Sequence, residues 1–359
     1  NLQKDHQQLK NSIKLLLEHD MTNLFYYHGI SIWNYVKLIF EQIFYDSYIP
    51  TYLRLIYGLE DYFKKNKPKQ IIQVYETGPY AKVFEVIAKK LEIKTIGIQH
   101  GMWATINPPE YLHKNIQNAK NPLGHPIPDL TCVFGEYDKK LLVEKGNYPS
   151  EKIMISGNLS LFNLNEIKES LNKNSITKKY DISNKQIILV PLSFRMNYPK
   201  KNRSEIILLN HLFSNFKDDS DKLFLVRPHP GDKFNQQTLS KICPSKNFIC
   251  SKLSLFEDIF VSDLIVLTYS SVGLEATLFN KPVFYVSVSK NESSNFSEYY
   301  EPFIKNGVIE TIPIDNLNLK IDKQFNLEFN DISTIKQNTI NYFFNKVDQR
   351  NLKNILTSN

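Results

Sequence analysis

Hydrophobic residues recur at helical spacing through the first 66 residues of the chain. Leu9, Ile13 and Leu17 fall four positions apart, which is the pattern of one apolar helix face, and two further sets of this kind follow. The last set ends in the polar run Lys-Lys-Asn-Lys-Pro-Lys at 64–69. The sequence therefore predicts a helical layer over residues 1–66.

From residue 70 onward the pattern changes to short apolar runs that alternate with helical segments. Strand, loop, helix, strand at this spacing is the signature of βαβ units and a parallel sheet. Strands are expected at 70–75, 94–99, 129–134, 152–156, 186–190, 222–226, 247–250, 263–267 and 282–286, and helices at 80–91, 138–145 and 335–347.

A polar segment rich in Asn, Lys and Ser separates two such series. We therefore predict an α/β fold: two Rossmann-like parallel-sheet domains that face a cleft, with the helical layer in front. The first domain is expected over residues 1–160, a linker over 161–185 and the second domain over 186–359. A chain of 359 residues is long enough for two hydrophobic cores.

Composition and charge narrow the classes of function. The net charge of +7 suits an anionic substrate or a membrane surface, but basic residues occur only in scattered pairs, so nucleic-acid binding is not expected. Three cysteines without metal spacing favour a reducing cytoplasm. The chain shows no signal-peptide pattern and no apolar run of membrane-spanning length. We expect a cytoplasmic protein, with peripheral contact to the inner membrane face left open.

Several common motifs are missing from the sequence. It contains neither G-x-G-x-x-G nor G-x-x-x-x-G-K-[ST], which disfavours dinucleotide and P-loop sites. No His/Cys cluster has metal spacing, so neither a metal nor another cofactor is expected. The one D-x-D motif, Asp219-Ser-Asp221, precedes a strand, where a solvated turn is expected.

The segment Arg227-Pro-His229-Pro follows the predicted strand 222–226 directly. Ligands of open α/β sheets bind at the carboxyl ends of the strands. The two prolines remove backbone donors and stiffen the loop, so His229 is held as a phosphate partner or a general acid needs to be. Arg227 could grip the same anion with two hydrogen bonds. The alternative is a loop histidine whose prolines only end the strand.

A second strand end carries Ser270-Ser271 at the start of a predicted helix. Hydroxyls beside the free N–H groups of a helix start form a phosphate site, although a serine there can also serve only as a helix cap. Glu275 lies in the first turn, where it suits the helix dipole or a ribose diol. Ser193, which follows the strand 186–190, is also expected to contribute to the donor site.

The first domain offers two candidate bases at strand ends. Glu76, before Thr-Gly-Pro, is placed to deprotonate an acceptor hydroxyl, or else serves as a first-turn acid of the following helix. His100, at the next strand end, is the rival base, and Gln99, His100 and Trp103 together could line an acceptor pocket instead. Gly157 and Asn158 are expected to shape the interdomain loop and to contribute to the donor site.

These motifs together resemble bacterial surface-carbohydrate glycosyltransferases of the GT-B type. The set comprises Glu76-Thr-Gly, Arg-Pro-His229-Pro and Ser270-Ser-Val-Gly-Leu-Glu275, and it is most similar to capsule Kdo transferases and bacterial sialyl- and polysialyltransferases. Those enzymes carry an acid-acid-Gly motif, and Thr77 stands here in place of the second acid. The resemblance implies a CMP-activated acidic sugar as donor and a surface glycan or lipid-linked glycan as acceptor. It implies that His229, Ser270 and Ser271 hold the donor phosphate and that Glu76 is the base.

Other interpretations of the same residues stay open. The Ser-Ser segment and His100-Gly-Met-Trp103 also resemble CDP-glycerol polyol-phosphate transferases of cell-wall polymer synthesis, and sugar-nucleotide 2-epimerases share the two-domain fold. A third alternative is a non-catalytic subunit of a glycan-assembly complex. Over residues 25–62, aromatic residues and Ile mix with Lys. The helices there could pack as a core layer or lie on a membrane that presents a lipid-linked acceptor.

Overall fold

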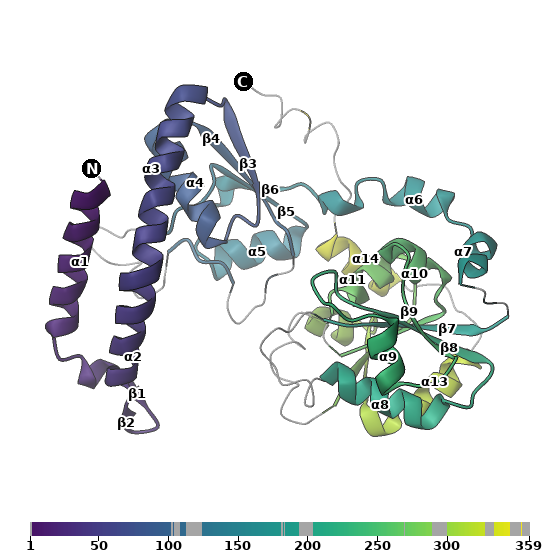
Figure 1. Cartoon of the computed structure of the whole chain (residues 1–359). Coiled ribbons are helices and arrows are strands. Elements are labelled where there is room, and N and C mark those ends of the chain that lie inside the picture. The colour runs from purple at the N-terminus through teal and green to yellow at the C-terminus, as the bar shows by residue number, and fades with distance from the viewer. Residues whose placement is uncertain are drawn as a thin grey trace.

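The computed structural model describes residues 2–101, 103, 108–112, 124–180, 182, 184–193, 204–268, 270–288, 300–326, 334–344 and 353. It confirms the α/β fold with two parallel sheets. In Figure 1 the N-terminal helices stand along the outer side of the first sheet, and the second sheet lies in a separate body.

The N-terminal layer is helical, as predicted, but it also contains a small hairpin that the apolar pattern does not reveal. Two strands of two residues each are too short to show an alternation. The helices are α1 (Leu2–Glu18), η1 (Thr22–Leu24), α2 (Trp33–Ile39), the π-helix η2 (Phe40–Tyr48) and α3 (Ile49–Asn66), and the hairpin strands are β1 (Tyr26–Tyr27) and β2 (Ile30–Ser31). Phe63 of α3 packs with Val83 and Ile87 of α4, which attaches the layer to the first sheet.

The first sheet has four parallel strands in the order β3-β4-β5-β6. Its strands and α-helices follow the predicted ranges within two residues, whereas the short helix η3 was not predicted. They are β3 (Gln70–Val74), α4 (Pro79–Lys90), β4 (Lys94–Ile98), β5 (Leu130–Val133), α5 (Glu136–Glu144), η3 (Ser150–Lys152) and β6 (Ile153–Ile155). Strand order equal to chain order brings the carboxyl ends of β3 and β4, which carry Glu76 and His100, next to each other.

The second sheet has six parallel strands in the order β12-β11-β10-β7-β8-β9. The order reverses at β7, so the carboxyl ends of β8 and β10 flank that of β7, the arrangement in which open α/β sheets bind ligands. The elements are β7 (Gln186–Pro191), α8 (Ser204–Phe216), β8 (Lys222–Arg227), α9 (Gln236–Ile242), β9 (Phe248–Cys250), α10 (Leu255–Val261), β10 (Leu264–Leu267), α11 (Val272–Leu278), β11 (Val283–Ser287), β12 (Glu310–Pro313), η6 (Ile314–Asn316) and α13 (Leu317–Phe325).

Two segments connect the sheets. The first is the polar linker predicted over 161–185, which contains α6 (Leu164–Ser170) and α7 (Lys173–Lys179) and follows the short helix η4 (Leu159–Leu161). The second is α14 (Thr334–Phe343), which packs on α5: Phe343 stacks on Tyr137 with ring centroids 4.3 Å apart. A Cβ at position 135 would lie 2.6 Å from the Phe343 carbonyl oxygen, so the close approach of α14 to the start of α5 needs glycine at this position. The domain limits at 160 and 186 stay a prediction.

Candidate functional site

A tight turn follows β3 and carries the first candidate base. The Gly78 amide donates to the Tyr75 carbonyl at 2.9 Å, which closes the turn Tyr75-Glu76-Thr77-Gly78. Tyr75 has a φ of +67°, a left-handed conformation that is unfavourable for an aromatic residue. A Cβ at Gly78 would lie 2.9 Å from the Tyr75 ring, so only glycine fits there. The turn therefore directs Glu76 from the end of the strand into the domain.

The Glu76 carboxyl is almost fully buried, with 1% of the residue exposed. Among the described residues its Oε2 atom has no hydrogen-bond partner. Burial raises the pKa of Glu76 to about 7, although its own backbone N–H and the Lys82 ammonium favour the charged form. A carboxyl that titrates near neutrality can both take and return a proton, as a general base requires.

Gly97, in the middle of β4, makes room for this side chain. A Cβ at position 97 would lie 2.8 Å from Cβ of Glu76 and 2.6 Å from Cγ of Pro128. Sequence reasoning did not single out Gly97. A glycine inside a strand signals a close approach, and that signal was present in the run Lys94-Thr-Ile-Gly-Ile.

A cavity of about 430 Å³ opens beside the Glu76 turn. Its lining combines charged, polar and apolar groups from the turn, α4 and the loops after β4 and α5: Thr77, Lys82, Pro108, Pro109, Glu110, His125 and Tyr148. Lys82 is held by the Pro126 carbonyl at 2.6 Å and by Glu85 at 3.1 Å. The cavity can hold a small polar molecule, and it borders Thr77, the residue after Glu76.

His100, the rival base, lies on the surface rather than in the domain. Its ring lies 4.3 Å from that of Tyr75, and partial burial lowers the pKa of the imidazole. Gln99 is buried: its side chain donates to Asp138 Oδ1 at 2.9 Å and accepts from the Phe134 amide at 2.8 Å. Trp103 is buried in the apolar cluster that includes Val133. Gln99 and Trp103 are therefore packed inside the first domain. Of the three residues, only His100 is accessible to a ligand.

In the second domain the Arg227 guanidinium is used inside the protein. Its Nη1 lies 2.5 Å from the buried carboxylate of Asp258 and donates to the Leu253 carbonyl at 2.9 Å. Desolvation raises the pKa of Asp258, and the Arg227 charge opposes that shift. Arg227 thus fixes the end of β8 against α10, and its expected grip on the donor phosphate stays a prediction.

We expect Arg227→Met to lower the free energy of unfolding by about 3 kcal/mol, because it leaves the Asp258 carboxylate buried without its cation. Chemical denaturation measures this change. Lys179→Met is the matched control: it removes the cation from the more exposed pair with Glu257, 2.8 Å apart, and should cost less than about 1 kcal/mol. Equal losses in the two variants would contradict the structural role of Arg227.

His229 lies in the exposed loop after β8. Its Nδ1 accepts a hydrogen bond from the Gly231 amide at 3.0 Å. In the neutral ring the proton is therefore on Nε2, which makes that atom a donor. The loop thus holds the imidazole in one tautomer, as expected for a group that binds a phosphate.

The Ser-Ser segment forms the connection from β10 to α11. Ser271 is the N-cap residue of α11, but its side chain makes no capping bond, and it is exposed. Ser270 is buried, and its Oγ accepts from the Val272 amide at 3.4 Å. The structure thus divides the two hydroxyls: Ser270 serves the helix start, and Ser271 faces solvent.

Glu275 lies in the first turn of α11 with its carboxyl inside the protein. Its Oε2 is buried and has no hydrogen-bond partner among the described residues, and burial raises its pKa to about 7. Tyr300, which donates to the Ser270 carbonyl, is near enough for the Glu275 charge to contribute to its raised pKa. Glu275 is half-buried as a residue, and its role toward a ribose stays a prediction.

The remaining predicted site residues also lie at strand ends. Ser193, after β7, is buried and donates through its hydroxyl to Glu205 of α8. Gly157, after β6, has a φ of +78°, which glycine adopts readily, and Asn158 follows it at the start of the connection to α6. The roles of Gly157, Asn158 and Ser193 toward a donor stay predictions.

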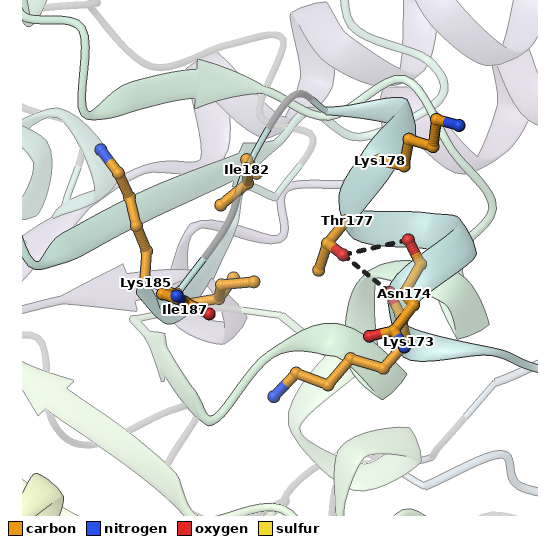
Figure 2. Close-up of a pocket in the computed structure, with 8 residues that line it drawn as sticks. Lys173, Asn174, Thr177, Lys178, Ile182, Lys185 and Ile187 are labelled. Atoms are coloured by element: carbon orange, nitrogen blue, oxygen red, sulfur yellow. Dashed lines mark hydrogen bonds between the residues drawn. The ribbon is translucent and has the colours of Figure 1, made fainter.

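A larger cavity, of about 500 Å³, lies at the opposite edge, where β7 begins. It is lined by residues of α7 and of the segment before β7, including Lys173, Lys178 and Lys185. Figure 2 shows the three ammonium groups pointing in different directions, so they do not converge on one anion. Because parallel sheets bind ligands at the carboxyl edge, this cavity is not the candidate site.

No protein-family model matches the chain. A curated relative, the uncharacterized protein MJ1060 of Methanocaldococcus jannaschii, is 24% identical over 258 residues. The match covers 69% of this chain but 41% of that protein, so the chain spans about two fifths of its relative's length.

Solved structures share the fold over most of the chain. The UDP-GlcNAc 2-epimerase of Rickettsia bellii aligns with a TM-score of 0.56 at 14% identity, over 87% of this chain and 80% of its own. The Neisseria meningitidis UDP-GlcNAc 2-epimerase bound to UDP-GlcNAc aligns with a TM-score of 0.55 at 13% identity, over 86% of this chain and 81% of its own. The M. jannaschii UDP-GlcNAc 2-epimerase in complex with UDP-GlcNAc and UDP aligns with a TM-score of 0.55 at 16% identity, over 86% of this chain and 81% of its own. The fold is therefore the GT-B arrangement of two Rossmann-like domains predicted above.

Proposed function

We propose that the protein is a nucleotide-sugar-dependent glycosyltransferase in which Glu76 deprotonates the acceptor hydroxyl. The observation that carries this proposal is the buried Glu76 carboxyl, which has a pKa of about 7 and an oxygen without a hydrogen-bond partner among the described residues, and which is followed by Thr77 in the lining of a cavity. Only 1% of Glu76 is exposed, so the proposal requires the turn Tyr75-Glu76-Thr77-Gly78 to move before an acceptor reaches the carboxyl.

Side chains of the second domain are placed to bind the phosphate of the sugar donor. His229 holds a donor Nε2 after β8, and Ser271 presents a hydroxyl at the start of α11 after β10. These strands flank β7, where the strand order reverses. Negative charge builds on the departing phosphate during sugar transfer, so fixed donors at that position stabilise the transition state more than the ground state.

The nucleotide is proposed to be a pyrimidine nucleotide. The His-Pro and Ser-Ser motifs resemble those of enzymes that use CMP-sugars, whereas the Neisseria meningitidis and M. jannaschii relatives were solved with UDP-GlcNAc or with UDP-GlcNAc and UDP. Two candidate functions follow. The first is transfer of an acidic sugar from CMP. The second, favoured by those relatives, is the use of a UDP-sugar, either in transfer or in 2-epimerisation.

Isothermal titration with CMP, CDP, UDP and NAD tests the proposal. We expect CMP or UDP to bind at least about tenfold more tightly than NAD, a difference of roughly 1.4 kcal/mol. Tightest binding by UDP would remove the CMP-sugar assignment, and tightest binding by CDP would favour the polyol-phosphate alternative. Failure of every pyrimidine nucleotide to bind would overturn the proposed function.

Offering the matching nucleotide sugar with and without glycan acceptors then separates the two reactions. A transferase releases nucleotide faster when its acceptor is present. An epimerase converts the sugar nucleotide alone, and the nucleotide stays attached. Conversion without an acceptor and without nucleotide release would replace transfer by epimerisation.

A further inference from the structure

The N-terminal helical layer ends in a group of exposed apolar side chains. Seven large apolar residues within sixteen positions of the chain are between 48% and 76% exposed: Leu24, Tyr26, Tyr27, Ile30, Tyr35, Leu38 and Ile39. We call this group the apolar tip. Soluble proteins rarely expose a contiguous apolar patch without a partner for it.

Rigid packing holds the tip in shape. Phe25 and Trp33 stack with ring centroids 5.2 Å apart, and Trp33 is buried. The Ile32 amide donates to the Phe25 carbonyl at 2.8 Å, which closes the hairpin onto the start of α2. Tyr35, Leu38 and Ile39 are spaced three and four positions apart, so they share one face of α2.

The charge of this segment suits an anionic surface. Residues 21–40 contain no Asp or Glu. Lys37 is half-buried and lies one turn after the buried Trp33, on the side of α2 away from Tyr35 and Ile39. Tyrosine suits a membrane interface, because it places an apolar body in the headgroup layer and keeps a polar end in water. The net charge of the whole chain, +7, has the sign that anionic lipids attract.

The backbone of the hairpin also suits such a surface. β1 and β2 pair with each other through Tyr26–Ser31 and Tyr27–Ile30, which reduces the number of backbone groups left without partners outside water. Among the described residues, none of the helices combines the length and hydropathy that a membrane crossing needs. Figure 1 shows α2 and the hairpin at the end of the helical arm, away from the second sheet.

We propose that the apolar tip docks on the surface of an anionic phospholipid membrane. The hairpin side chains enter the interface, and the exposed face of α2 lies along it. The arm then holds the first domain, with its candidate acceptor cavity, near the membrane. This docking does not depend on the proposed nucleotide chemistry.

Co-sedimentation of the full chain with vesicles tests the proposal. We expect binding to vesicles of phosphatidylglycerol and phosphatidylcholine, and weaker binding to phosphatidylcholine alone. The double variant Tyr27→Asp/Ile30→Asp should bind the anionic vesicles at least about tenfold more weakly. Both side chains are at least 66% exposed, so the substitutions leave the core intact. Leu319→Asp, at a 75% exposed leucine on α13, is the matched control and should bind like the parent.

Each contrary outcome overturns the proposal. Equal losses in Leu319→Asp and in the double variant would show that added charge alone weakens binding. If the parent binds neither vesicle type, the tip does not recognise lipid. A dimer in light scattering that the double variant converts to a monomer would then show that a second copy of the chain covers the tip. Thermal unfolding of the double variant is a separate readout: an unchanged midpoint shows that the fold is retained.

Discussion

Glu76→Gln is expected to reduce sugar transfer by a factor of about 10²–10⁴, because it removes the general base while leaving the donor site unchanged. The affinity for the nucleotide should therefore equal that of the parent. Glutamine has the shape of a protonated glutamic acid, so it fits the space that Gly97 and Pro128 leave for Glu76. Steady-state kinetics with the cognate sugar nucleotide, together with calorimetric titration of the nucleotide, measure both quantities.

The pH dependence gives a second readout of the same group. Burial raises the pKa of Glu76 to about 7, and a base acts only when it is deprotonated. The rate of sugar transfer should therefore rise with pH up to about 7 and level off above it. The residual rate of Glu76→Gln should not show this rise. Stability moves in the opposite direction. A raised pKa favours the folded state at low pH, and that contribution is lost as pH rises from about 4.5 through about 7. Glu76→Gln should then be at least as stable as the parent at pH 8.

Two variants show whether Glu76 itself is responsible. Glu85 is a second buried carboxyl of this domain, whose pKa burial also raises to about 7, but it is bonded to Gln73 at 2.7 Å and to Lys82. Glu85→Gln should keep most of its turnover. His100→Ala removes the accessible imidazole. If His100→Ala abolished transfer while Glu76→Gln did not, the base would be His100 and the polyol-phosphate mechanism would gain support.

The repeating βα pattern was enough to predict the fold. Strands such as Ile187–Val190 and Leu223–Val226 are buried on both faces and read as unbroken apolar runs, so their positions follow from the sequence. The edge strand β12 was missed, because Glu310-Thr-Ile-Pro is too short and polar to be recognised. The hairpin at Tyr26–Ser31 was missed for the same reason of length.

The candidate site could be predicted only in part. Strand order, which the sequence does not contain, decides that β8 and β10 flank β7. The direction of the side chains could not be predicted from the sequence either. A strand-end arginine reads as a phosphate ligand, yet Arg227 turns to Asp258, a residue 31 positions away whose burial depends on the packing of α10. Glu76 was identified from its position, but its burial depends on Gly97 of the neighbouring strand.

His229→Ala is expected to reduce transfer by a factor of about 10²–10³, the usual cost of removing one donor that stabilises developing charge. The Gly231 amide donates to Nδ1, which keeps the neutral ring's proton on Nε2. Alanine removes that donor, whereas His229→Gln retains an N–H group at similar reach and should recover part of the loss.

The division between kcat and KM distinguishes this role from a structural one. A donor that strengthens its bond as the phosphate leaves affects kcat, while a residue that only shapes the loop affects nucleotide affinity and turnover together. His19→Ala, at another exposed histidine, is the control and should match the parent. Equal losses in the alanine and glutamine variants would show that an N–H donor alone does not replace the histidine, whereas full turnover in His229→Ala would remove His229 from the reaction. The donor phosphate would then have to depend on the start of α11, where Ser271 presents the exposed hydroxyl.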